Sequence, residues 1–281
     1  MNRAMKSYRF RKFKDRLMIS LSFLALGVAL IPLASIIVEN ILRGHSAINI
    51  SFLIEEIPPM GESGGGMGPA IQGTIIVVSL ASLIGVPIGV LSGIYLAEFG
   101  KSKIATAIRF LNDVMTNTPS IILGLFGWAT VVVAVGWSVL AGTVALAIMM
   151  IPIVTRTTEE SVKLVPAGIR EAAIALGIPV WKTILTVVLN ASKKGIATGI
   201  LLAIARISGE TAPLLLTVLG SRFWFSGLTQ PTAALPLSIF RFSQSPFRVD
   251  WSRVWGASLI LTMIVLTISL IVRYFTRERY K

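Results

Sequence analysis

Two oppositely charged side chains lie in an otherwise apolar stretch in the last third of the chain. Arg206 and Glu210 are four positions apart in GILLAIARISGETAPLLLTVLG, so a helix would place both on one face, where they can pair. A charge at the centre of a bilayer costs at least about 2.5 kcal/mol, and such a residue usually faces protein or a water-filled path. A guanidinium offers paired donors to the oxygens of an oxyanion. We expect Arg206, Glu210 and the adjacent Thr211 to line an anion path; an ion pair that only holds helix geometry is the alternative.

Two residues beside this pair weaken the helix that would hold it. Pro213 lacks the amide hydrogen that would bond to the carbonyl oxygen of Gly209, and Gly209 itself loosens the turn. Irregular backbone at membrane depth usually lines a cavity or a moving joint. We therefore predict a kink at Gly209 and Pro213 that can act as a gate.

A second stretch with helical signals, VPAGIREAAIALGIPVWKTILTVVLNAS, is too polar to cross a membrane. Pro166 suits a first helical turn, and Gly177 followed by Pro179 is a stop signal. Between these limits apolar side chains recur at helical spacing, at Ile169, Ala172, Ala173 and Leu176. The pattern predicts a short amphipathic helix at the membrane surface, followed by a second helix over residues 181–189.

Residue counts exclude several classes of chemistry. The chain contains no cysteine and a single histidine, His45, so disulfides, cysteine nucleophiles and clusters of thiolate or histidine metal ligands are excluded, and we expect no metal site. The closest approach to a phosphate-binding loop is Gly100-Lys101-Ser102, but Tyr95 stands where the required glycine would be. We expect a chain that is not an enzyme and holds no cofactor, with nucleotide chemistry supplied by a partner.

The composition indicates that lipid is the solvent for most of the chain. Hydrophobic residues make up 54% and charged residues 14% of the 281 residues, and the mean hydropathy is +0.80. This leaves too little polar surface to cover a water-soluble globule. The net charge of +13 falls in short clusters between apolar runs. It therefore indicates how the chain is oriented in the membrane and does not form a continuous basic surface for binding nucleic acid.

Six apolar windows are long enough for membrane-spanning helices, which need about 20 residues. Arg206 lies close to the midpoint of the fifth window, and Gly136 and Trp137 break the run between the third and fourth, which favours a tight hairpin. The windows are residues 18–38, 71–96, 120–135, 137–155, 196–219 and 255–274. The sequence predicts an all-α membrane protein with six transmembrane helices.

Basic residues indicate the orientation, because short cytoplasmic loops accumulate lysine and arginine. With six spans, four basic clusters fall on one side, while the opposite loops contain several acidic residues. Both termini are therefore expected in the cytoplasm. The clusters comprise Arg3, Lys6, Arg9, Arg11, Lys12, Lys14 and Arg16; Lys101, Lys103 and Arg109; Arg156, Lys163, Arg170, Lys182, Lys193 and Lys194; and Arg277, Arg279 and Lys281.

The surface helix resembles the E-A-A-x-x-x-G motif of ABC-importer permeases at Glu171, Ala172, Ala173 and Gly177. In that family the helix docks in a groove of the ATP-hydrolysing subunit and transmits its closure. Small alanines allow close approach, and Glu171 can pair with a basic groove residue. In the longer family pattern, Asn190 stands where proline is common. The alternative is an amphipathic helix resting on lipid headgroups.

Further stretches resemble the PstA-type permease subunits of phosphate importers. Residues 205–214 read A-R-x-x-G-E-T-A-P-L, residues 117–126 read NTPSIILGLF, and SRFW followed by QPTAALPLSIF precedes the last span. The resemblance implies the type I ABC importer permease fold in a prokaryotic cell membrane. It also implies import of inorganic phosphate by alternating access, with a role in transport for Arg206.

The resemblance implies the partners as well: a PstC-type second permease subunit, two PstB-type ATPases that bind ATP and Mg, and a PstS-type phosphate-binding protein. Two other functions stay open. Another oxyanion, such as sulfate, molybdate or phosphonate, would suit Arg206 equally well. A secondary transporter that works without ATP, with Arg206 and Glu210 as an ion relay, is disfavoured by the docking motif.

The expected organisation has four parts. Residues 1–17 form a basic cytoplasmic segment, and residues 18–70 form the first span and a glycine-rich outer loop. Residues 71–274 form the permease core with a cytoplasmic coupling loop at 156–194, and residues 275–281 form a cytoplasmic tail. The first span exceeds the length of a signal-peptide apolar region and lacks a small-x-small exit, so we expect it to stay uncleaved.

Overall fold

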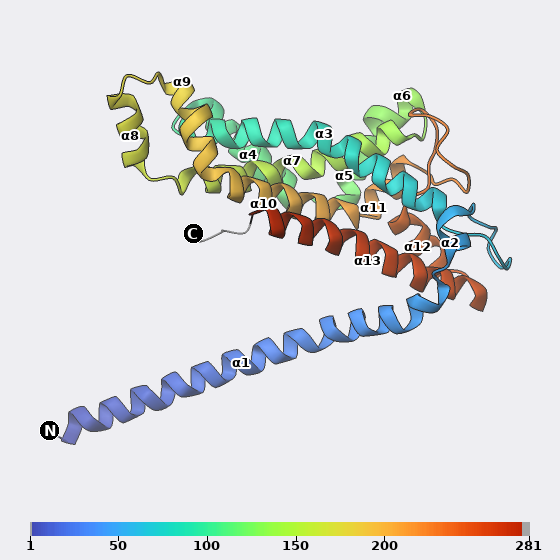
Figure 1. Cartoon of the computed structure of the whole chain (residues 1–281), viewed down its shortest axis with the longest axis horizontal. Coiled ribbons are helices and arrows are strands. Elements are labelled where there is room, and N and C mark those ends of the chain that lie inside the picture. The colour runs from blue at the N-terminus through green and yellow to red at the C-terminus, as the bar shows by residue number, and fades with distance from the viewer. Residues whose placement is uncertain (1, 277–281) are drawn as a thin grey trace.

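The computed structural model describes residues 2–276, and the regular structure in this range is helical, with no β-strand. An elongated bundle is formed around α3 (Gly68–Glu98), α7 (Val139–Lys163) and α13 (Arg248–Thr276), as Figure 1 shows. The long helix α1 (Asn2–Gly44) diverges from this bundle and meets it at its C-terminal end. There Asn40 Nδ2 donates a hydrogen bond to Thr262 Oγ1 at 3.1 Å.

Six spans are present when a bent helix pair is taken as one. Within the described residues, five helices are long and apolar enough to cross a membrane: α1, α3, α7, α13 and the segment Val180–Ser208. That segment joins α9 (Val180–Lys182), the π-helical turn η3 (Thr183–Val188) and α10 (Leu189–Ser208). Shorter elements connect the spans: η1 (His45–Ala47), α2 (Ile50–Ile54), α8 (Ala167–Ala175), α11 (Ala212–Thr217) and α12 (Leu235–Ser243).

The third span is a broken one. Helix α4 (Lys103–Asn117) meets the segment Ser120–Val135 at an angle of 108°. That segment consists of α5 (Ser120–Gly127), the π-helical turn η2 (Trp128–Val132) and α6 (Val133–Val135). Pro119 keeps Thr118 extended, with φ −77° and ψ 130°, and so ends α4. Hydropathy alone identifies residues 120–135 and misses α4, whose polar residues lower its average.

The fifth predicted window, residues 196–219, is wrong at both ends. Helix α10 ends at Ser208 with Gly209 as its C-cap, and α11 is a separate helix. At the inner side, the helix predicted at residues 181–189 is continuous with α10. Arg206 therefore lies in the last turn of α10 and not near the middle of one continuous span.

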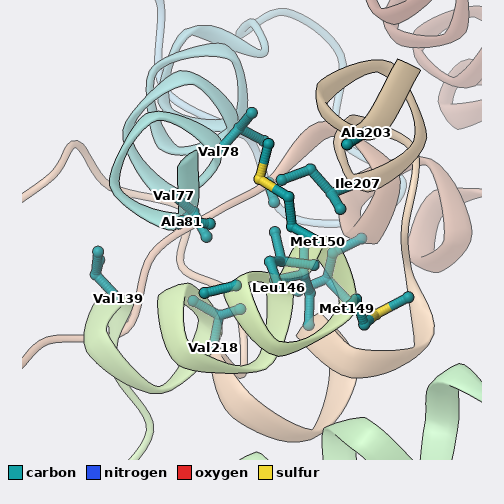
Figure 2. Packing of buried hydrophobic residues seen from close by; sticks show 14 of the residues in the cluster. Val77, Val78, Ala81, Val139, Leu146, Met149, Met150, Ala203, Ile207 and Val218 are labelled. Atoms are coloured by element: carbon teal, nitrogen blue, oxygen red, sulfur yellow. The ribbon is translucent and has the colours of Figure 1, made fainter. Parts of the chain in front are cut away.

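Glycines allow α3 and α7 to approach closely. Gly85, Gly89 and Gly93 are spaced by four along one face of α3, and each lies against α7. A Cβ on Gly89 would lie 2.6 Å from the Cβ of Val154, so only glycine fits there without displacement. The bundle core consists of apolar side chains from α3, α7, α10 and the segment after α11 (Figure 2). It includes Val77, Val78, Ala81, Leu146, Met150, Ala203, Ile207 and Val218.

At the outer end, the glycine-rich tract is attached to the start of α13. Asp250 and Arg253 form a buried ion pair, and Arg253 also donates hydrogen bonds to the carbonyl oxygens of Glu62 and Gly64. The amide of Gly61 donates to Asp250 Oδ2 at 3.0 Å. These bonds hold residues 61–64 of the glycine-rich outer loop against the start of α13.

The two ends of the chain relate differently to the expected organisation. The basic segment predicted at residues 1–17 is, from Asn2 onward, the first part of α1 and continuous with the first span. Met1 and residues 277–281, most of the predicted cytoplasmic tail with its basic cluster, lie outside the described residues.

Candidate functional site

Arg206 and Glu210 lie beside each other at the break between α10 and α11. The distance from Arg206 Nε to Glu210 Oε1 is 3.9 Å, which is an ion-pair distance too long for a hydrogen bond. The Arg206 side chain is 61% exposed, and that of Glu210 is 19% exposed. Among the contacts of the described chain, this ion pair is the one that the Arg206 guanidinium makes. Its five N–H donors therefore remain available to a ligand.

Arg206 lies on a face of α10 that turns away from the bundle. On another face, Ala203 and Ile207 are fully buried in the cluster that contains Ala81 of α3 and Met150 of α7 (Figure 2). Ala81 and Met150 are near the middle of their helices, so Arg206 lies at mid-depth in the bundle. A charge there costs about 2.5–3.5 kcal/mol if it faces lipid. In a membrane this face of α10 must be covered by water or by another chain.

The backbone break next to Arg206 connects it to the third span. The amides of Gly209 and Glu210 close the end of α10 with 3.3 Å bonds to the carbonyl oxygens three residues earlier. Pro213 follows in the first turn of α11, where a missing amide hydrogen is tolerated, just after Thr211. Pro213 lies so close to Gly124 of α5 that a Cβ on Gly124 would be 2.6 Å from the Pro213 Cα. A movement of α5 would therefore reach the break directly.

Helix α8 contains the predicted docking residues and lies across the end of the bundle that faces the same way as the start of α1 (Figure 1). Glu171, Ala172 and Gly177 are exposed, whereas Ala173 is buried. Gly177 has a φ of +77°, and the amides of Gly177 and Ile178 bond to carbonyl oxygens in the last turn of the helix. This turn fixes where α8 ends.

Helix α8 and the segments next to it expose several apolar side chains in addition to Glu171. These are Leu164, Ile169, Ile174, Leu176, Val180 and Trp181. An apolar patch of this kind, with a polar residue among its members, is typical of a protein or membrane interaction site. The structure thus groups the predicted Glu171, Ala172 and Gly177 at one end, and Arg206, Gly209, Glu210, Thr211 and Pro213 together at mid-depth.

Two arginines that the motifs did not indicate connect the helix ends on the side of the bundle where α8 lies. Arg170 of α8 donates to Glu98 at the end of α3, with Nε and Nη2 at 3.2 and 3.0 Å from Oε1. Arg109 of α4 donates to Glu159 of α7, at 3.1 and 2.8 Å. The sequence contains no signal of either contact, because Arg170 and Glu98 are 72 positions apart and Arg109 and Glu159 are 50 positions apart.

Comparison with known proteins identifies the family. Residues 85–278 match the family model described as binding-protein-dependent transport system inner membrane component. The phosphate transport system permease protein PstA of Yersinia pestis is 43% identical over 98% of this chain and 94% of its own length. That of Pasteurella multocida is 42% identical over 98% of each chain. The chain belongs to the PstA family of permeases.

As a PstA-family permease, the chain is the inner membrane component of a transport system and not an enzyme. Its fold agrees with this. A chain in the crystal structure of a bacterial alginate ABC transporter, in complex with an alginate pentasaccharide-bound periplasmic protein, superposes with a TM-score of 0.67. The match covers 94% of this permease and 95% of that chain at 13% identity. The expected type I ABC importer permease fold is confirmed.

Proposed function

We propose that this chain is the subunit of an ABC importer that conducts inorganic phosphate into the cell, with Arg206 contacting the anion on its way. The observation that supports the cargo most is the identity of 43% and 42%, over nearly the whole chain, to permeases named for phosphate transport. The role of Arg206 is supported by its N–H donors, which are unoccupied at mid-depth in a membrane bundle.

Phosphate is suited to this position by its charge and shape. A guanidinium presents N–H donors in a planar fork that matches two oxygens of a phosphate group. Glu210 lies close enough to moderate that charge, which keeps the anion from binding too tightly to leave. Thr211 adds a hydroxyl next to the pair, and the break at Gly209 and Pro213 supplies a joint at which α11 can move against α10.

The proposed mechanism is alternating access with partner subunits. A PstC-type permease would cover the exposed face of α10, so that the path runs between the two chains. A PstS-type protein would deliver phosphate from outside. Two PstB-type ATPases would bind ATP and Mg, and one would receive the exposed Glu171, Ala172 and Gly177 of this chain in its groove, while the buried Ala173 holds the helix against the permease. The exposed apolar side chains of α8 and the segments next to it support such a contact.

The test is uptake of labelled inorganic phosphate by cells or vesicles that contain the complex with Arg206→Gln. Because a hydrogen bond to a charged group contributes about 1.5–3 kcal/mol, uptake should fall at least about tenfold at normal protein level. Arg206→Lys, which keeps the charge without the fork, should retain part of it. Lys101→Gln, which removes an exposed cation from the segment between α3 and α4, is the control and should transport normally.

Two results would contradict the proposal. Normal phosphate uptake by Arg206→Gln would show that the pair with Glu210 is only structural. Inhibition of wild-type uptake by a small excess of sulfate, molybdate or phosphonate would assign the permease to another oxyanion.

A further inference from the structure

Arg170 is next to Glu171 in α8, but its side chain turns toward the membrane bundle. Besides the two bonds to Glu98 Oε1, its Nη1 donates to the carbonyl oxygen of Val165 at 2.6 Å and its Nη2 to that of Val162 at 2.9 Å. The Arg170 and Glu98 side chains are 23% and 14% exposed. One guanidinium therefore joins α8 to the inner ends of both α3 and α7.

The positive charge of Arg170 lies at the C-terminal ends of two helices. Glu98 is the last residue of α3, and Val162 is in the last turn of α7. A carboxylate is unfavourable at a helix C-terminus, whereas a cation there is stabilising and satisfies free carbonyl groups. Arg170 therefore neutralises the charge of Glu98 and also caps the C-terminus of α7. The contact is thus specific in geometry, unlike an exposed surface ion pair.

Helix α8 also rests on the segment that leads to Arg206. Helix α8 contacts η3, the π-helical turn that continues into α10, and Ala173 of α8 and Thr183 of η3 are both buried. The inner end of α3 has a second clamp, since Arg109 of α4 donates to the carbonyl oxygens of Leu96 and Gly100 at 3.0 and 2.8 Å. Helix α8 is therefore held both by η3, which continues into α10, and by the inner ends of α3 and α7.

We propose that Arg170 is a positioning residue that makes α3 and α7 follow the movement of α8, so that an ATPase docked on α8 drives the whole inner end of the permease. This rests on the proposed function, in which α8 receives the ATPase. Without Arg170, the short connection between α7 and α8 absorbs the movement. Docking and ATP hydrolysis then continue, and transport does not follow.

The experiment uses the complete complex in vesicles, with inorganic phosphate as the transported probe. Arg170→Gln should retain ATPase subunits on co-purification at the wild-type ratio, while phosphate imported per ATP hydrolysed falls about tenfold, within the range of measured couplings between sites. Glu98→Gln should reduce the same ratio by less, because Arg170 keeps its two carbonyl contacts. Lys193→Gln removes an exposed cation from the same end and should match the wild type.

A cross-link between positions 98 and 170 distinguishes loss of the contact between α8 and α3 from damage to the fold. The chain has no native cysteine, so Glu98→Cys with Arg170→Cys can be joined by a bifunctional thiol reagent of the length of the original pair. We expect uncoupled hydrolysis before cross-linking and recovery of phosphate import after it.

Three outcomes would overturn the inference: unchanged import per ATP in Arg170→Gln, loss of ATPase co-purification in that variant, or no recovery on cross-linking. Failure of the proposed function is a different result, because the wild-type complex would then bind no ATPase or import no phosphate.

Discussion

Gly177 ends α8 with a φ of +77°, a conformation that costs a residue with a side chain about 1–2 kcal/mol. Gly177→Ala should therefore disturb the turn and weaken docking of the ATPase by about fivefold, as 1 kcal/mol implies. Gly168→Ala, in the first turn of the same helix, is a matched control, because nothing lies within 4 Å of a Cβ there and its φ is not positive. Co-purification of ATPase subunits measures both. Equal retention in the two variants would contradict the role of this turn.

At the residue scale, the sequence identifies groups whose type is unusual for their surroundings. Arg206 and Glu210 stand out because they are charged within an apolar run, and Glu171 with Gly177 stands out by its spacing. Arg170 does not, since a basic residue in a cytoplasmic loop is expected on topology grounds alone. Its role depends on Glu98, 72 positions away, and only the packed helices reveal that partner.

At the element scale, the approach of α3 to α7 depends on the absence of a side chain at Gly89. Gly89→Leu should separate the two helices, because overpacking a close interface costs about 1–3 kcal/mol. We expect a lower thermal unfolding temperature of the detergent-solubilised chain. Gly27→Leu in α1 is the control, since nothing lies within 4 Å of a Cβ there. A similar loss in both variants would contradict the packing argument.

Hydropathy predicts which segments cross the membrane but not where helices break within them. It finds α3 almost to its ends, because this helix is apolar along its length, but it starts α13 seven residues late, since Arg248, Asp250 and Arg253 lower the average of its first turns. It fails at the third and fifth spans, since the bend after α4 depends on Pro119 and the end of α10 on Gly209, and neither residue changes the average. The spacing of Gly85, Gly89 and Gly93 was a visible signal of close helix packing that such averages discard.

At the scale of the whole molecule, the described chain has an unfinished surface in two places. The apolar window of α1 has none of its residues buried, and Arg206 is exposed at mid-depth. Lipid can cover the apolar surface of α1, but lipid around the charged Arg206 side chain is unfavourable in free energy. The proposed function therefore requires water or a second permease chain on the face of α10 that holds Arg206, and in that proposal the anion passes along this face.

The most direct measurement is thiol labelling of Arg206→Cys in the assembled complex, since the chain has no other cysteine. A small water-soluble thiol reagent should label this position in at least one of the nucleotide-free and ATP-trapped states, because the reagent arrives through water and apolar burial disfavours the reactive thiolate. Ala203→Cys, three residues earlier on the buried face, should stay unlabelled in both. If Arg206→Cys is protected in every state, no aqueous anion path passes this residue, and the account is contradicted.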